Sequence, residues 1–164
     1  MKDSALNTDH AKALLDRARR YCALSEQCES GVRQKLITWG AVSSEVDAIV
    51  ASLRADSYLD DFRYARSYCE SKMLGQQWGR QKVVYQLRMK HLHKDAIDAA
   101  LAAVDEGRYL DALRSAADTK LREMGLGPDP QLSFDEHRRL FSFLLSRGYT
   151  STEINQVITN IDEQ

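Results

Sequence analysis

The chain contains three diverged copies of one unit, and this internal repeat constrains its fold more than any other feature. Residues 32–53 align without a gap on residues 140–161, at an offset of 108. The middle of the chain joins the same register at an offset of 51 from the first copy. The clearest matches are Val32, Leu36, Val46 and Val50 with Val83, Leu87, Ile97 and Leu101, and with Leu140, Leu144, Ile154 and Ile158. A period of about 50 residues is typical of an array built from one small structural unit.

The apolar pattern inside each copy predicts helices. Apolar residues recur at spacings of three, four and seven, which places them on one face of a 3.6-residue turn. No run alternates in the manner of a strand. The last helix of each copy has the clearest stripe, formed by Val46, Ile49, Val50 and Leu53, by Ile97, Ala100, Leu101 and Val104, and by Ile154, Val157, Ile158 and Ile161. We therefore predict an all-α protein of three tandem three-helix repeats, arranged as an elongated, curved modular rod.

Several helix starts are legible as well. A Ser or Thr followed three residues later by Glu has the spacing of a capping box, which occurs at Ser133 with Glu136 and at Thr150 with Glu153. The tripeptide Tyr-Leu-Asp at 58–60 recurs at 109–111. We therefore predict Asp60 and Asp111 as N-caps. The repeats are expected at 1–56, 57–107 and 108–164. Each repeat should pack against its neighbour, because a unit of about 50 residues buries too little surface alone to be stable.

Composition narrows the class of protein but does not identify it. The chain has 23 basic and 24 acidic residues and no apparent signal peptide or apolar span of transmembrane length, so we expect a soluble, cytoplasmic monomer. Cys22, Cys28 and Cys69 are expected to be buried, reduced thiols. The four histidines do not cluster with other ligands at metal-binding spacing. We find no catalytic motif, and predict no metal site, no cofactor and no enzymatic activity.

The charge is distributed unevenly. Residues 62–94 hold eight basic residues against one acidic residue, a net charge of +7, whereas the remainder carries −8. Each basic residue taken alone is as compatible with a solvated helix face as with a binding site. As a set they favour binding of an anionic partner, because solvated helices usually intersperse both signs. The candidate partner-binding residues are Arg63, Arg66, Lys72, Arg80, Lys82, Arg88 and Lys90.

Two anionic partners are compatible with this charge, an acidic protein surface and nucleic acid. A three-helix unit could present its third helix to a DNA major groove. Here the third helix of the middle repeat carries acidic residues that repel phosphates, at Asp95, Asp98, Asp105 and Glu106. Base reading is therefore not expected. A DNA-binding helical module that acts through phosphate contacts remains the alternative.

Residues 58–92 resemble the signature of the RecX family of bacterial recombination regulators. That pattern has a glycine, Tyr-Leu-Asp-Asp, a variable residue, Arg-Phe-Ala, a basic helix end, a glycine with basic residues after it, and a leucine near Lys-Gly. Residues 143–149 resemble the last repeat of the family. This chain has Ser57 and His91 where the family has glycines, and Tyr64 where it has phenylalanine. The matching positions are Tyr58, Leu59, Asp60, Asp61, Arg63, Ala65, Gly79, Arg80, Leu87 and Lys90.

The resemblance implies a function and a set of roles. Members of the RecX family are non-enzymatic modulators of RecA that lodge in the groove of the RecA–single-stranded DNA filament. They suppress ATP hydrolysis, strand exchange and co-protease activity in DNA repair, homologous recombination and the SOS response. For this chain the resemblance implies RecA as the partner, with the basic surface as the contact and only weak, non-specific DNA binding. It implies a structural role for Tyr58, Leu59, Asp60, Asp61, Gly79 and Leu87.

Overall fold

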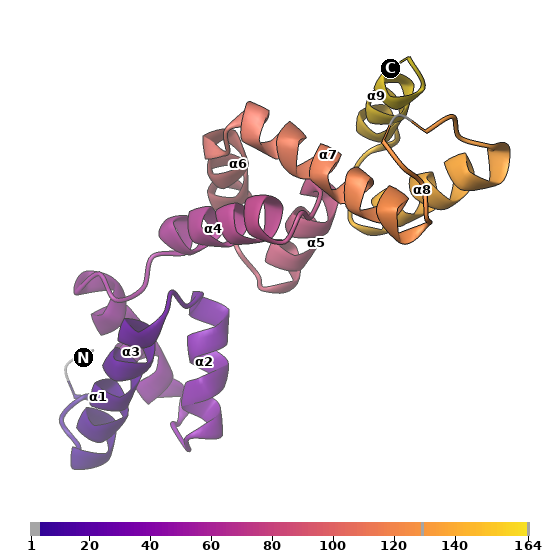
Figure 1. Ribbon diagram of the computed structural model, residues 1–164. Coiled ribbons are helices and arrows are strands. Elements are labelled where there is room, and N and C mark those ends of the chain that lie inside the picture. The colour runs from indigo at the N-terminus through magenta and orange to yellow at the C-terminus, as the bar shows by residue number, and fades with distance from the viewer. Residues whose placement is uncertain (1–3, 129, 164) are drawn as a thin grey trace.

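A computed structural model describes residues 4–128 and 130–163. Within these ranges every regular element is helical. Figure 1 labels the α-helices in chain order. The elements are α1 (Asp9–Leu24), α2 (Glu29–Thr38), α3 (Ser43–Ala55), α4 (Asp61–Cys69), the π-helical segment η1 (Glu70–Gly75) that continues α4, α5 (Arg80–Met89), α6 (Lys94–Ala103), α7 (Glu106–Glu123), α8 (Phe134–Ser146) and α9 (Ser151–Asp162).

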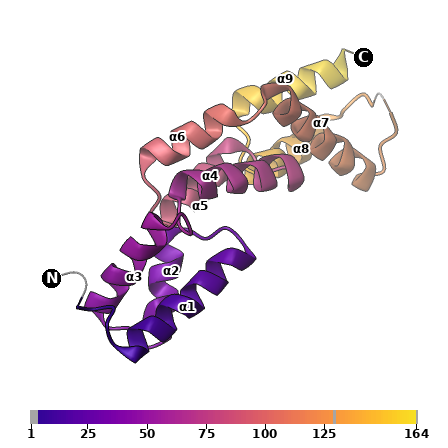
Figure 2. The same cartoon turned by 90° about the vertical axis from the view of Figure 1, so that its left-hand side faces the viewer.

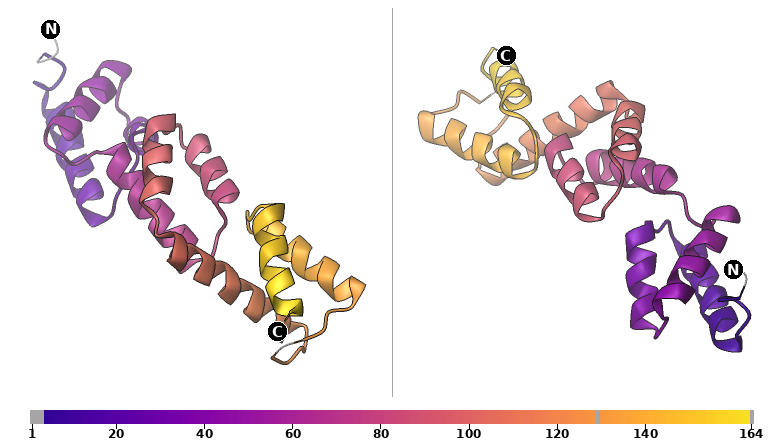
Figure 3. Two further views of the ribbon diagram at one scale, coloured as in Figure 1. Left: turned by 90° about the horizontal axis from the view of Figure 1, so that it is seen from above. Right: turned by 180° about the vertical axis from the view of Figure 1, so that it is seen from behind.

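The helices form three units that follow one another along an elongated molecule. Unit 1 contains α1–α3, unit 2 contains α4–α6 with η1, and unit 3 contains α7–α9. Figure 2 and Figure 3 place unit 1 and unit 3 at opposite ends, with unit 2 between them. The predicted all-α fold of tandem three-helix repeats is confirmed.

The second helix of each unit follows the predicted register. The bounds of α5 are those of α2 moved by 51 residues. Leu36, Leu87 and Leu144 occupy equivalent positions on α2, α5 and α8, and none of them has exposed surface. In each unit the turn after this helix contains one residue with a left-handed backbone, and these residues are Gly40 (φ 92°), His91 (φ 60°) and Gly148 (φ 97°). The repeat therefore extends to the conformation of the turn.

Helix capping agrees with the sequence at three sites and differs at one. The side chains of Asp60, Ser133 and Thr150 accept hydrogen bonds from backbone amides at the starts of α4, α8 and α9. The prediction for Asp111 was wrong, because Asp111 lies inside α7. The N-cap of that helix lies six residues earlier, where the side chain of Asp105 accepts a 2.8 Å hydrogen bond from the Arg108 amide. The predicted division between residues 107 and 108 thus falls in the first turn of α7.

The hydrophobic core is divided unevenly among the units. Unit 1 has a core of its own, which includes Leu36 and Leu53. Units 2 and 3 share one continuous core, in which Leu87 of α5 and Leu144 of α8 belong to a single cluster. Among the residues of unit 1, only Cys28 joins that second cluster. The protein therefore consists of one small body and one double-sized body.

The three cysteines are buried and free, as the sequence predicts. Cys22 lies in the core of unit 1, whereas Cys28 and Cys69 lie in the shared core. Burial raises the pKa of the Cys69 thiol to about 11 and also raises that of Cys22. Both thiols are therefore protonated and inert at neutral pH.

Candidate partner-binding surface

Helix α5 carries part of the candidate surface and is held at both ends. At its N-terminus the amides of Gly79 and Gln81 donate to the carbonyl oxygens of Arg147 and Gly148, over 2.7 and 3.1 Å. At its C-terminus the carbonyl oxygen of Lys90 accepts from the hydroxyl of Ser30 in unit 1. The two joins therefore have the same arrangement. The N-terminus of α5 meets the turn after α8, and the N-terminus of α2 meets the turn after α5. This head-to-tail order of helix dipoles is electrostatically favourable.

Gly79 is required at the join between units 2 and 3. A Cβ atom on this residue would overlap the backbone of Gly148 and Tyr149. The guanidinium of Arg147 and the hydroxyl of Tyr149 both donate to the carbonyl oxygen of Gln77, over 3.1 and 2.9 Å. Close backbone approach therefore fixes how α5 is presented relative to unit 3.

Arg80 is engaged inside the protein and does not form part of an open basic face. Its guanidinium pairs with Glu153 at 2.8 Å, pairs with Glu106 and lies 3.9 Å from the ring centroid of Tyr109. The buried hydroxyl of Tyr109 donates to Glu153 at 3.2 Å. Burial raises the pKa of Tyr109, so its hydroxyl remains a donor. Arg80, a predicted partner-binding residue, is therefore engaged in contacts within the protein.

Arg63 is likewise occupied by an internal contact. Its Nε atom donates to Glu26 of unit 1 at 2.5 Å, and another guanidinium nitrogen donates to the Ser57 carbonyl oxygen at 3.0 Å. The side chain retains 43% exposure. Arg63 thus joins units 1 and 2 while remaining partly open to solvent.

Lys72 of η1 and Lys82 of α5 meet at one aromatic ring. Their Nζ atoms lie 4.9 and 4.2 Å from the ring centroid of Trp78, which is half-buried in the loop between them. Each distance is within the range of a cation–π interaction. Trp78 is not among the predicted site residues, although a tryptophan between two lysines in a basic window is a usable signal.

Arg66, Arg88 and Lys90 are the remaining members of the predicted set. Arg66 and Arg88 are exposed on α4 and α5, and Lys90 is half-buried at the end of α5. None of the three side chains forms an ion pair with a residue in the described ranges. Arg66 lines the small cavity between α4, η1 and α6, and neither Lys72 nor Lys82 contributes to that lining. The seven predicted residues therefore occupy several sites along unit 2.

The residues to which the resemblance gives a structural role lie mainly at joins and in cores. Leu59 and Leu87 are buried. Asp61 accepts a 2.9 Å hydrogen bond from the Glu29 amide of unit 1. Asp60 caps α4, and Tyr58 packs against the core of unit 1. The Tyr-Leu-Asp-Asp motif at residues 58–61 therefore helps to hold unit 1 against unit 2.

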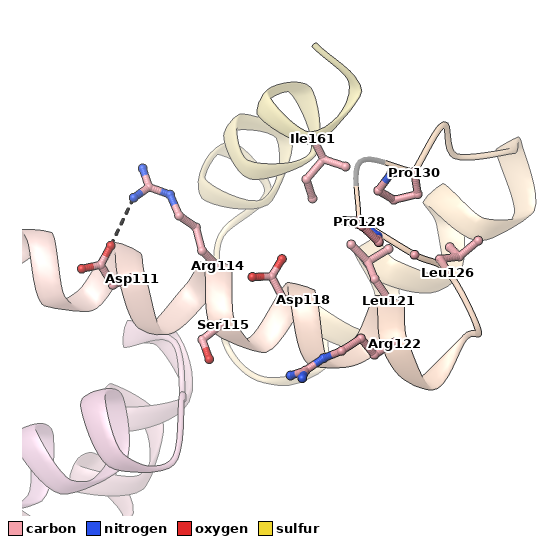
Figure 4. A pocket seen from close by; sticks show the side chains of 11 residues that line it. Asp111, Arg114, Ser115, Asp118, Leu121, Arg122, Leu126, Pro128, Pro130 and Ile161 are labelled. Carbon is pink, nitrogen blue, oxygen red and sulfur yellow. Dashed lines mark hydrogen bonds and ion pairs between the residues drawn. The ribbon is translucent and has the colours of Figure 1, made fainter. Parts of the chain in front are cut away.

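A cleft that lies away from the predicted residues is formed by α7, α9 and the loop before α8. It has a volume of about 680 Å³. Figure 4 shows Asp111 and Arg114, which pair at 3.2 Å, together with Asp118 and Arg122 along α7, and with Pro128 and Pro130 opposite. Its charges are mixed, and it contains none of the predicted basic residues.

Neither a candidate metal-binding cluster nor a candidate membrane-spanning helix is found among the described residues. They contain no group of three or more His, Cys, Asp or Glu side chains that could hold a metal ion. Within the same ranges, none of the helices combines the length and the apolar character needed to span a bilayer.

Comparison with known proteins agrees with the repeat architecture. The family model described as the second three-helix domain of RecX matches residues 60–101. The regulatory protein RecX of Cronobacter sakazakii is 29% identical over 99% of this chain and 100% of its own length. The regulatory protein RecX of Clostridium tetani is 25% identical over 88% of this chain. The present chain spans only 65% of the length of that longer protein. The crystal structure of RecX from Lactobacillus salivarius superposes with a TM-score of 0.81, at 17% identity, over 95% of this chain and 99% of that one.

The fold and its surface define a class of protein, an all-helical tandem-repeat scaffold that presents charged and aromatic side chains. Its relatives are named regulatory proteins. This chain is similar to proteins of the RecX family, and that similarity supports a regulatory role.

Proposed function

We propose that this protein is an inhibitor of RecA that binds in the groove of the RecA–single-stranded DNA filament. Its action is to suppress ATP hydrolysis, strand exchange and co-protease activity without catalysis of its own. Unit 2 supplies the main contact, and the other units extend the reach of the molecule along the filament. The observation that carries the proposal is the similarity to RecX proteins together with the basic surface of unit 2.

Two physical arguments support this mechanism. An elongated array of similar units suits a polymer of identical subunits, because several weak contacts on one molecule add to a high avidity. A protein that binds one arrangement of the filament better than another shifts the equilibrium between them by its difference in affinity. Inhibition by this route requires no nucleophile, metal or cofactor.

A DNA-binding module is the second candidate, and one observation favours it. Trp78, Lys72 and Lys82 place an aromatic face beside two cations. Proteins that bind single-stranded nucleic acid combine such groups, because the aromatic ring stacks on bases and the cations contact phosphates. The net charge of −8 outside residues 62–94 opposes it. Such binding would be non-specific and would weaken steeply with added salt.

The proposal is tested by the rate of ATP hydrolysis by RecA on single-stranded DNA in the presence of the full chain. We expect inhibition by the intact protein and a clear loss of it in the variant Arg66→Glu/Arg88→Glu. Both side chains are exposed and form no ion pair in the described ranges, so their reversal should leave thermal unfolding almost unchanged. Arg80 is kept intact because its reversal would disrupt the join to unit 3.

The matched control is Lys12→Glu/Arg20→Glu, which makes the same change of charge on exposed residues of α1. It should inhibit nearly as well as the original chain. Equal inhibition by both double variants would place the contact outside unit 2. Tight binding to naked DNA, with no effect on RecA, would favour the second candidate.

A further inference from the structure

The exposed face of α5 combines apolar and basic side chains. Tyr85 and Met89 are 60% and 61% exposed and lie four residues apart, which places them on neighbouring turns of one face. Other large apolar side chains are exposed at scattered positions in the described ranges. None of those others forms such a pair on a single helix. Contiguous exposed apolar side chains mark interaction sites more often than isolated ones do.

The repeat provides an internal comparison for these two positions. The residues equivalent to Tyr85 are Gln34 in unit 1 and Ser142 in unit 3, and those equivalent to Met89 are Thr38 and Ser146. All four equivalents are polar, although the buried leucines of the three helices coincide. The three-helix unit therefore folds without an apolar residue at either position. Tyr85 and Met89 are not needed for packing, which leaves recognition as the reason for their exposure.

The charges around this pair indicate the chemistry of the partner. Helix α5 contains no acidic residue, whereas α2 contains Glu29 and α8 contains Asp135 and Glu136. Arg88 lies beside the pair and is exposed without an ion pair in the described ranges. Tyr, Met and Arg are enriched at protein interfaces, where a buried anchor inside a charged rim provides most of the affinity.

We propose that Tyr85 and Met89 form an apolar anchor that inserts into a hydrophobic pocket on a partner protein, with carboxylates of that protein around the pocket to meet Arg88. This inference rests on the proposed function, because it assigns the anchor to the contact with the RecA filament. A purely electrostatic contact would be lost at high salt. The anchor adds a component that salt does not screen, since burial of apolar surface does not depend on charge.

The test compares the full chain with the variant Tyr85→Ser/Met89→Ser, which introduces the residues found at the equivalent positions of unit 3. Affinity for RecA filaments on single-stranded DNA is measured by titration at low and high salt. We expect the variant to bind at least about tenfold more weakly at both salt concentrations, with its unfolding transition unchanged. The matched control is Leu24→Ser/Phe134→Ser, which removes exposed apolar side chains from units 1 and 3 and should bind normally.

Each other outcome overturns the inference in a recognisable way. If the full chain binds filaments and the Tyr85→Ser/Met89→Ser variant binds equally well, the anchor is refuted while the proposed function stands. If the full chain does not bind filaments at all, the proposed function itself fails. If the variant loses affinity equally for naked single-stranded DNA, the face stacks on bases. If sedimentation shows a dimer that the variant abolishes, the occupant is a second copy of this chain.

Discussion

The two joins between units have the same topology and different chemistry. At both, the N-terminus of a second helix meets the turn after the second helix of the next unit. Between units 2 and 3 the contact is backbone to backbone, at Gly79 and Gly148, above a continuous core. Between units 1 and 2 side chains make the contact, through Ser30, Asp61 and Arg63, and the cores remain separate apart from Cys28.

This difference indicates how a repeat protein distributes rigidity. A join that buries apolar surface and admits no Cβ atom has one geometry, because any shift costs both packing and hydrogen bonds. A join made of partly exposed side chains costs much less to rearrange. Units 2 and 3 should therefore behave as one cooperative body that presents α5 in a fixed orientation. Unit 1 should unfold separately.

The largest expected effects come from the equivalent core leucines. Leu36→Ala, Leu87→Ala and Leu144→Ala should each cost about 2–5 kcal/mol, because each removes a fully buried side chain. The chain's two tryptophans separate the bodies, since Trp39 packs on the core of unit 1 and Trp78 on the shared core. Each variant is made in a chain that keeps only one of the two tryptophans. Urea unfolding followed by the fluorescence of that tryptophan then measures the stability of one body alone.

The comparison predicts a specific pattern for these three variants. Leu36→Ala should lower the transition seen by Trp39, whereas Leu87→Ala and Leu144→Ala should both lower the one seen by Trp78. A Leu144→Ala variant that leaves the Trp78 transition in place would break the claim of a shared core.

Gly79→Ala should have the next largest effect. The added methyl group overlaps the backbone of Gly148, so the variant must separate units 2 and 3 or distort α5, at a cost of about 3 kcal/mol. Gly75→Ala is the control, because a Cβ atom there meets nothing within 4 Å. The Trp78 transition measures both. Equal stability of the two variants would contradict the close approach on which the join depends.

Arginine substitutions compare the polar parts of the two joins. Arg80→Gln should cost about 1–3 kcal/mol, because it leaves the 16% exposed carboxylate of Glu153 without its cation and removes the guanidinium from the ring of Tyr109. Arg63→Gln should cost less than about 1 kcal/mol, because its pair with Glu26 is partly exposed. Chemical denaturation of both variants at two salt concentrations measures the difference. A larger loss of stability for Arg63→Gln than for Arg80→Gln would contradict the conclusion that the join between units 2 and 3 is the more rigid one.

The smallest expected effect is a gain in stability at the turn after α5. His91 holds a left-handed backbone where units 1 and 3 have glycine, so His91→Gly should stabilise the protein by about 0.5–1 kcal/mol. The reciprocal change Gly148→His should be strongly destabilising, since the side chain would meet Lys82 as well as adopt a strained backbone. Thermal unfolding of the two variants tests this. A destabilising His91→Gly would mean that the imidazole contributes more than the backbone strain costs.

Much of the fold could be predicted from the sequence, because the repeat and the helical stripe are local patterns. The equivalence of Leu36, Leu87 and Leu144 and the capping boxes of unit 3 follow from spacing alone. Asp111 misled the prediction because a shared tripeptide does not establish a shared helix start. In unit 2 the motif lies in an extended linker, whereas in unit 3 it lies inside α7.

The candidate site was less predictable, because contacts between units decide which charges remain open. Arg80 pairs with Glu153, which is 73 residues away, and no sequence periodicity encodes that pairing. The shared core could not be predicted from the sequence either. Deletion of the chain from residue 108 onward would expose apolar surface of unit 2, because units 2 and 3 form one cluster. Tyr85 and Met89 were missed because an apolar residue on a helix is usually assigned to its core.

Photo-crosslinking from the equivalent positions 34, 85 and 142 tests the central claim most directly. A photoreactive phenylalanine analogue at each exposed position in turn reports which second helix touches RecA in the assembled filament. We predict the strongest crosslink to RecA from position 85. This crosslink should be lost when RecA is present but not assembled into a filament. Crosslinks from position 34 or 142 with none from position 85 would contradict the assignment of α5 as the principal contact.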